Sequence, residues 1–269
     1  MKNPMKNIML TIEYDGTNYN GWQIQDKAQR KKGGRVKTIQ GVLEGALFNI
    51  LSARVRLISS SRTDSGVHAI NHVANFKSST TLKPARIKEA LNALLPDDIA
   101  IKKAEEVDSR FNAQYDSASK TYRYRICNSD YISPFIKKYA YHFRQPLDIS
   151  LMRKEAVALL GRHNFRAFMS ACRGNDGELR RDCVMTIKRL EIRPHKSGLI
   201  EIIIEADGFL YNMARNIIGT LIEIGRGKFS PGSARYILRK KDRRLAGPTI
   251  PAKGLCLVEV KYGRGNAHF

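Results

Sequence analysis

The stretch TIQGVLEGALFNIL, residues 38–51, sets the pattern from which the fold of the first half can be predicted. Its apolar residues recur at the i, i+3, i+4 and i+7 spacing that gathers side chains on one face of an α-helix. They are Ile39, Val42, Leu43, Ala46, Leu47, Ile50 and Leu51. Thr38 precedes them and is a residue type favoured as an N-cap. The stretch therefore predicts an amphipathic helix that begins near Thr38.

Apolar alternation on both sides of this helix predicts strands at residues 8–14, 54–60, 67–76 and 99–106. A second helix is expected between Pro84, which suits a first helical turn, and Pro96, which ends the helix. The resulting order is β-α-β-β-α-β, which is the order of a split ferredoxin-like unit.

The second half of the chain repeats this order. Strands are expected at residues 120–127, 184–193, 199–207 and 255–262, and helices at 150–160 and 211–224, with an added helix after Ser230. The fold class that follows is α+β, with ferredoxin-like domains at residues 1–110 and 111–269. We expect their sheets to lie side by side with an active-site cleft between the halves. Residues 169–182 show no clear period and are expected to cover or rim that site.

Charge points to the partner of this protein. The 269 residues include 47 Lys and Arg against 25 Asp and Glu, a formal net charge of +22. The alternative is a merely basic surface without a partner, but so large an excess favours a polyanion, and nucleic acid is the natural one. The densest basic runs, which suit contact with phosphates, are Lys27, Arg30, Lys31, Lys32, Arg35 and Lys37, and then Arg239, Lys240, Lys241, Arg243 and Arg244.

Several other classes of protein are disfavoured. The cysteines, Cys127, Cys172, Cys183 and Cys256, lie far apart and form no C-x-x-C pair, so neither a zinc ribbon nor a redox motif is indicated. We expect reduced thiols and a cytoplasmic location. The start of the chain lacks the apolar region of a signal peptide, and no run is long enough to cross a bilayer, so no membrane is expected among the partners.

The loop between two expected strands, SSRTDSGVHA at residues 60–69, carries the candidate catalytic group, Asp64. The alternative reading is an ordinary Asp-Ser-Gly turn, because Asp bonds to its own backbone and Gly accepts positive φ. A loop that joins two central strands projects from a rigid sheet, however, and holds a carboxylate in a defined place beside Arg62.

These residues resemble the signature Gly-Arg-Thr-Asp-Ala-Gly-Val-His-Ala of the tRNA pseudouridine synthase A family. This chain has Ser61 in place of the first glycine and Ser65 in place of the alanine. Other segments that match in order are YDGT at 14–17, GWQ at 21–23, KTYRY at 120–124, GFLYNM at 208–213, RNI at 215–217 and AKGL at 252–255. The resemblance extends over nearly the whole chain, whereas the stretch from Lys27 to Lys37 is longer than is usual in the family.

The resemblance implies a role for four residues. Asp64 is implied to be the catalytic carboxylate, Tyr122 to pack on the target uracil and Arg215 to pair with Asp64. Arg62 is implied to lie against the RNA backbone or to fill the space left by the flipped nucleotide. Tyr122 and Tyr124 alternate along one strand, from which we expect one side chain to face the core and the other the cleft. Arg215 lies close to an apolar helix face, which favours a buried acid as its partner.

The implied reaction is the isomerisation of uridine to pseudouridine in tRNA, at positions 38, 39 and 40 of the anticodon stem-loop. The reaction has no net redox change, so no cofactor and no metal are expected. Asp64 can act as a nucleophile or as a base, and the sequence leaves both open. The resemblance also implies a homodimer in which one tRNA touches both subunits.

Two other functions compete with this one. A non-catalytic tandem RNA-binding protein would explain the charge and the fold but not an acid in an exposed loop of a basic protein. A metal-dependent nuclease would use Asp176, Glu178 and Asp182, which are instead expected to form a solvated charged loop. A zinc site from His163, Cys172 and Cys183 fits no common ligand spacing.

Overall fold

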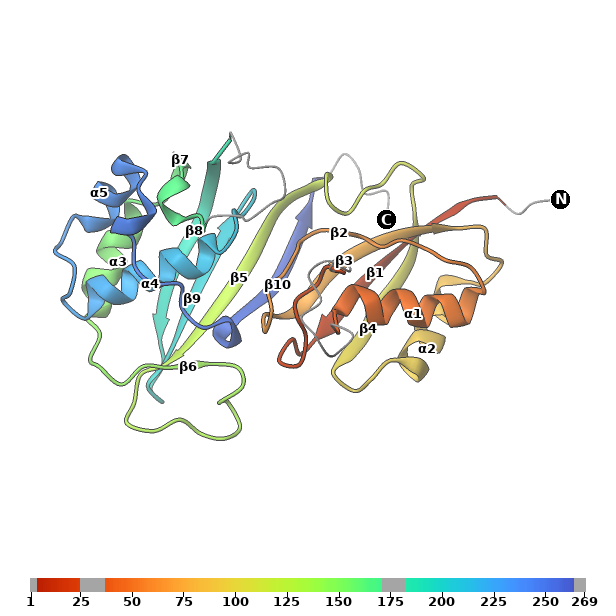
Figure 1. Cartoon of the computed structure of the whole chain (residues 1–269), viewed down its shortest axis with the longest axis horizontal. Coiled ribbons are helices and arrows are strands. Elements are labelled where there is room, and N and C mark those ends of the chain that lie inside the picture. The colour runs from red at the N-terminus through yellow and green to blue at the C-terminus, as the bar shows by residue number, and fades with distance from the viewer. Residues whose placement is uncertain (1–3, 25–36, 171–181, 264–269) are drawn as a thin grey trace, which may run out of the picture. The chain divides into compact units, whose positions relative to one another are not determined.

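The computed structural model describes residues 4–24, 37–170 and 182–263, and shows an α+β protein, as expected (Figure 1). The chain divides into two compact units. Unit 1 takes its residues from Met1–Ala118 and Cys256–Phe269, and unit 2 is Ser119–Leu255. We describe each unit by itself.

Unit 1 has the predicted β-α-β-β-α-β order. Its elements are β1 (Lys6–Tyr14), α1 (Ile39–Leu51), β2 (Ile58–Ser59), β3 (His68–Ser78), α2 (Pro84–Leu94) and β4 (Ile99–Val107), joined by β10 (Leu255–Tyr262) from the end of the chain. The strand order is β4-β1-β3-β10, and β2 pairs with β3. β1 is antiparallel to both β3 and β4, whereas β10 runs parallel to β3.

Both helices of unit 1 form where the sequence predicts them. The Thr38 hydroxyl accepts a hydrogen bond from the Gly41 N–H at 3.2 Å, so Thr38 is the N-cap of α1. The buried face of α1 includes Ile39, Leu43, Ala46 and Leu47. In α2, Pro84 occupies the first turn, and Ile87 and Leu91 are buried.

The predicted strand at residues 54–60 is wrong in its length, because only Ile58–Ser59 pair with β3. Just before β2, two side chains of α1 form the backbone hydrogen bonds that a neighbouring strand would otherwise make. Glu44 accepts from the Leu57 N–H at 2.9 Å, and the Gln40 amide donates to the Leu57 carbonyl at 3.4 Å. These bonds satisfy the backbone of Leu57, so the polar groups that a ladder would use are already occupied.

Unit 2 has the expected elements with additions. They are β5 (Ser117–Cys127), β6 (Tyr141–His142), α3 (Ile149–Val157), β7 (Gly161–Asn164), β8 (Val184–Pro194), β9 (Leu199–Ala206), α4 (Met213–Gly225) and α5 (Ser233–Lys240), with 3-10 turns at Arg166–Phe168, Arg243–Leu245 and Ala252–Gly254. The strand order is β5-β9-β8-β7, with β6 beside β5. The helix after Ser230 is confirmed as α5, whereas the short strands β6 and β7 were not predicted.

Helices cover one face of the unit 2 sheet. In Figure 1, α3, α4 and α5 lie together beside β8 and β9, and α3 contacts both β8 and the other two helices. The even-numbered residues of β9, Ile200, Ile202 and Ile204, are at most 4% exposed. Most of α4 is buried as well, so the start of this helix is a rigid platform for the site residues described below.

Residues 111–118 and the C-terminal strand both pack within unit 1. Tyr262 of β10 donates a hydrogen bond to the Ala113 carbonyl at 3.0 Å, and its ring centroid lies 5.1 Å from that of Phe111. These residues share a small core with Met9 and Val73. Residues 111–118 and the end of β10 therefore pack with unit 1, and the boundary between the two repeats stays a prediction from the sequence pattern.

Candidate active site

Asp64 lies in the loop between β2 and β3, and both ends of that loop are fixed by backbone hydrogen bonds. The Ser60 N–H donates to the Val73 carbonyl at 2.9 Å, and the Val67 N–H donates to the Asp64 carbonyl at 3.1 Å. Gly66 has a φ of +78°, the left-handed conformation that a turn needs there. The reading as a turn is thus correct for the backbone, while the Asp64 side chain is half-buried at its apex.

The segment after β1 holds this loop from a second side. The Trp22 N–H donates to the Thr63 carbonyl at 3.0 Å, and the Gly66 N–H donates to the Tyr19 carbonyl at 3.3 Å. The Ser65 hydroxyl also donates to the Tyr19 carbonyl, at 3.1 Å. Two motifs that are far apart in the sequence, residues 14–23 and 61–69, therefore meet around Asp64.

The buried side chains of Tyr14 and His72 lie next to the loop. The Tyr14 hydroxyl is 2.7 Å from the Thr63 hydroxyl and 3.2 Å from Nδ1 of His72. The His72 ring stacks on Trp22 with a centroid distance of 3.9 Å and an interplanar angle of 12°. The sequence did not predict these contacts. Tyr14 and Trp22 fall in the motifs YDGT and GWQ, but spacing alone does not indicate a contact with the loop.

Arg62, next to Thr63 in the same loop, has an exposed side chain. An exposed guanidinium beside Asp64 is accessible to a phosphate group. Its contact with RNA stays a prediction.

Tyr122 lies on β5 of unit 2 and is 6% exposed. Its ring meets that of Phe209 edge to face, with centroids 5.0 Å apart at 85°. The expectation that Tyr122 and Tyr124 face opposite ways is wrong, because side chains two residues apart in a strand point to the same face. Tyr124 is fully buried, and its hydroxyl donates to the Pro251 carbonyl at 2.8 Å. Burial raises the pKa of Tyr124 well above its usual range.

Arg215 lies in the first turn of α4, and its guanidinium is held by two neutral oxygens of unit 2. Nε donates to the Ile250 carbonyl at 2.8 Å, and Nη1 donates to the Asn212 side-chain oxygen at 2.9 Å. From the sequence we expected a buried acid as the partner of Arg215, and these two acceptors were not predicted. Asp64 belongs to unit 1 and Arg215 and Tyr122 to unit 2, so the convergence of the three residues stays a prediction.

The second basic run divides into exposed and buried members. Arg239, Lys240 and Lys241 are exposed at the end of α5. Arg243 is instead turned into the fold, where Nη1 donates to the Gly247 carbonyl at 2.9 Å, and burial lowers its pKa. Arg243 is therefore an internal hydrogen-bond donor, and its contact with phosphates stays a prediction. The run from Lys27 to Lys37 lies outside the described residues except for Lys37.

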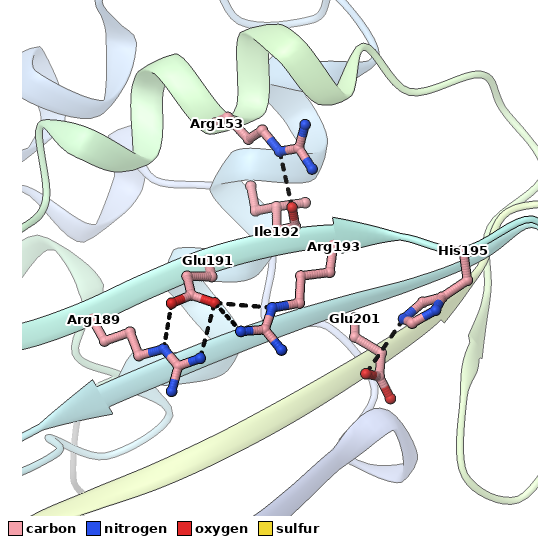
Figure 2. Close-up of polar contacts among 7 residues, drawn as sticks. All are labelled: Arg153, Arg189, Glu191, Ile192, Arg193, His195 and Glu201. Carbon is pink, nitrogen blue, oxygen red and sulfur yellow. Dashed lines mark hydrogen bonds and ion pairs between the residues drawn. The ribbon is translucent and has the colours of Figure 1, made fainter.

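Part of the positive charge of unit 2 is neutralised on its sheet. Glu191 of β8 accepts from Arg189 at 2.5 and 2.9 Å and from Arg193 at 2.5 and 2.9 Å (Figure 2). The hydrogen bond from Arg189, together with that from Arg193 and the charges of both guanidinium groups, lowers the pKa of Glu191 to about 2, while burial acts in the opposite direction. Glu201 on β9 pairs with Arg125 at 2.8 Å and lies 3.4 Å from His195. These arginines are less available to RNA than the net charge suggests.

The residues of the other candidate sites lie partly outside the described ranges. Within residues 4–24, 37–170 and 182–263, no three His, Cys, Asp or Glu side chains are grouped so that they could hold a metal ion. Asp176, Glu178 and Cys172 lie outside these ranges. Among the described residues, Cys127, Cys183 and Cys256 form no disulfide. Among the described helices, none has both the length and the apolar character needed to cross a membrane.

Comparison with known proteins adds a full-length match. The model of a family described as tRNA pseudouridine synthase matches residues 10–116 and 156–263. A protein named tRNA pseudouridine synthase A from a Thermoanaerobacter species is 41% identical over 96% of this chain and all of its own length. Proteins with the same name from Caldicellulosiruptor saccharolyticus and Clostridium kluyveri are 42% and 44% identical, again over 96% of this chain and all of their own length.

Among solved structures, a Cbf5-Nop10-Gar1 complex contains a chain with a TM-score of 0.34 and 10% identity. The match covers 93% of this chain and 48% of that one.

Proposed function

The chain belongs to the tRNA pseudouridine synthase family, and on that premise we propose that it isomerises uridine to pseudouridine in tRNA with Asp64 as the catalytic carboxylate. The observation that carries the proposal is the identity of 41–44% over the full length of the relatives. The geometry of unit 1 supports it, because hydrogen bonds from two separate segments fix the loop that presents Asp64.

The reaction breaks the bond between N1 of uracil and C1′ of ribose, turns the base and forms a bond between C5 and C1′. The proton on C5 is then lost to solvent and N1 gains a proton, so atoms and charge balance without a redox partner. Uracil can leave as an anion spread over its ring oxygens, so a second carboxyl group to protonate the leaving group is not needed. Asp64 would act as the nucleophile at C1′ or as the base that takes a proton from C2′.

The other residues would serve this step from their own elements. Arg215 would keep Asp64 ionised, because an opposite charge within a few ångströms lowers a carboxyl pKa by about 1 to 3 units. Tyr122 would limit the movement of the detached base with the face of its ring. Arg62, exposed beside Asp64, would contact the RNA backbone or fill the space vacated by the target nucleotide.

The proposed substrate is the anticodon stem-loop of tRNA, at positions 38, 39 and 40. Uridines there must leave their stack before C1′ can be reached, at a cost of a few kcal/mol. Contacts of exposed basic residues such as Arg239 and Lys240 with phosphates would offset that cost. We propose further that the protein acts in the cytoplasm as a homodimer, in which one tRNA contacts both subunits.

The experiment uses unmodified tRNA transcripts labelled with tritium at C5 of uridine, without added metal. Isomerisation replaces the C5 hydrogen, so tritium appears in water in proportion to pseudouridine formed. We expect release from transcripts with uridine at positions 38–40 and none when those uridines are replaced by cytidine. Release that persists after this replacement would refute the proposed positions.

The same assay separates the enzyme from a non-catalytic tandem RNA-binding protein. A binder alone would retain tRNA without releasing tritium. We expect release by the wild-type protein only, together with tRNA binding by both the wild type and the Asp64→Ala variant. Equal release by the two proteins would exclude Asp64 from the chemistry and leave the family activity in place.

A further inference from the structure

Asn216, in the first turn of α4, has a side-chain amide that is saturated with hydrogen bonds. The residue is 0% exposed. Its nitrogen donates to the Phe168 carbonyl at 2.8 Å and to the Ser170 hydroxyl at 3.3 Å. Its oxygen accepts from the Thr249 hydroxyl at 2.6 Å and from Nη2 of Arg243 at 3.0 Å. Two donors and two acceptor positions are the full capacity of an amide, so Asn216 binds two separate segments at once.

Those two segments also carry the acceptors that hold Arg215. The Ile250 carbonyl, which accepts from Nε of Arg215, directly follows Thr249. The Asn212 side chain accepts from Nη1 of Arg215 and donates through its nitrogen to the Ser170 hydroxyl at 3.1 Å. Asn216 is therefore linked to both acceptors, to one through Thr249 and to the other through Ser170.

Residues 246–250 are themselves pressed against α4. Arg243 donates to the carbonyls of Ala246 at 3.3 Å and Gly247 at 2.9 Å, and to the Thr249 hydroxyl at 3.3 Å. The Gly247 N–H donates to the Thr220 hydroxyl at 2.9 Å. A Cβ at Gly219 would lie 2.1 Å from the Pro248 carbonyl oxygen, so the two backbones are in direct contact. The carbonyl of Ile250 is thus fixed by packing as well as by hydrogen bonds.

We propose that Asn216, Thr249 and Arg243 are positioning residues for the isomerisation, because together they hold the two acceptors that orient the Arg215 guanidinium. A planar guanidinium bound on Nε and Nη1 has a defined plane and direction. If either acceptor is lost, the Arg215 side chain can occupy several rotamers. Its proposed electrostatic effect on Asp64 is then weakened. The inference rests on the proposed function, in which Arg215 serves the reaction.

The test uses a pair of substitutions at Thr249. Thr249→Val keeps the shape but removes the hydroxyl that donates to Asn216, whereas Thr249→Ser restores it. We expect Thr249→Val to lower kcat for tritium release about 10-fold to 100-fold with a tRNA affinity within about twofold of wild type. Thr249→Ser should recover at least half of the wild-type kcat. A Thr249→Val enzyme with wild-type kcat, or a loss confined to tRNA affinity, would overturn the proposal.

An Arg215→Lys background separates positioning from a general effect on the fold. If Thr249 acts through Arg215, adding Thr249→Val to Arg215→Lys should change kcat less than about twofold. If Thr249→Val lowers kcat as much in the Arg215→Lys background as in wild type, Thr249 acts independently of Arg215, which would contradict the proposal. If Thr249→Val does not fold, Arg243→Lys removes hydrogen bonds of the same cluster and keeps the charge. Its effect on kcat should likewise be less than about twofold in the Arg215→Lys background. A wild-type protein that releases no tritium would instead refute the proposed function itself.

Discussion

Gly21 lies against the backbone of the Asp64 loop, so its replacement by alanine is a direct way to displace the candidate catalytic group. Gly21 has a φ of +83°, and a Cβ there would lie 2.5 Å from the Thr63 carbonyl oxygen and 3.1 Å from the Asp64 carbonyl carbon. Ordinary van der Waals contact begins at 3.4 Å, so the alanine methyl group and the loop must separate by about 0.9 Å. The neighbouring atoms are backbone atoms and cannot rotate away.

The magnitude of the effect has two parts. The left-handed conformation costs an alanine about 1–2 kcal/mol, and overpacking costs about 1–3 kcal/mol more, so we expect the free energy of unfolding to fall by about 2–5 kcal/mol. A misplacement of about 1 Å in a reacting group can lower the rate by about 100-fold. We therefore expect Gly21→Ala to reduce kcat for pseudouridine formation by roughly that factor in protein that is still folded.

Urea unfolding and tritium release measured on the same preparation give the two quantities. Gly227→Ala is the matched control, because Gly227 has a φ of +78° but no described atom within 4 Å of its Cβ position. It should lose about 1–2 kcal/mol of stability and keep wild-type kcat. Gly45→Ala, inside α1 and equally open among the described atoms, should gain up to about 1 kcal/mol. Wild-type kcat in folded Gly21→Ala would show that the substitution does not displace Asp64, and an equal loss of kcat in Gly227→Ala would show that the loss does not depend on contact with the loop.

Three further predictions concern charge. Burial lowers the pKa of Lys120 below 10.5, with Asp207 acting in the opposite sense, so the unfolded chain binds the proton more tightly. Lys120→Met should therefore be more stable than wild type at pH 7. The difference between their free energies of unfolding should narrow as pH rises towards 10.5. A variant that is less stable than wild type in urea unfolding would contradict this. Glu155 is buried and accepts the N–H groups of Gly232 at 2.6 Å and Ala234 at 3.0 Å, at the start of α5. Glu155→Gln should cost about 1–3 kcal/mol and speed amide hydrogen exchange in α5, whereas unchanged exchange would show that this cap is unimportant. The tRNA affinity of wild type should fall steeply as salt is raised from about 50 to about 200 mM, and an affinity indifferent to salt would exclude phosphate contacts as its source.

The fold was largely predictable because its signals are local. The cap at Thr38 and the apolar stripe behind it predict α1, and Pro84 and Pro96 bracket α2, as the structure confirms. The length of β2 was not predictable, because Gln40 and Glu44 reach across from α1 to satisfy Leu57. The sequence of residues 54–60 does not indicate the contact of Gln40 and Glu44 with the Leu57 backbone.

The site was predictable only in part. Asp64 stood out because an acid in a loop between strands of a basic protein is unusual, and the loop lies where the sequence indicated. The supports of Arg215 were missed, because Ser170, Asn216 and Thr249 are separated by tens of residues and have no shared period. The internal hydrogen bonds of Arg243 were not predicted, because a run of basic residues does not show which member turns inwards.

The role of Asp64 is tested by the rate of pseudouridine formation by Asp64→Asn, with enzyme in excess over tRNA so that a single turnover is observed. The amide keeps the shape of the side chain but removes both its charge and its capacity as a nucleophile or base. We expect a rate at least about 100-fold below that of wild type at the same bound fraction of tRNA. A wild-type rate from this variant would show that the carboxylate takes no part in the reaction.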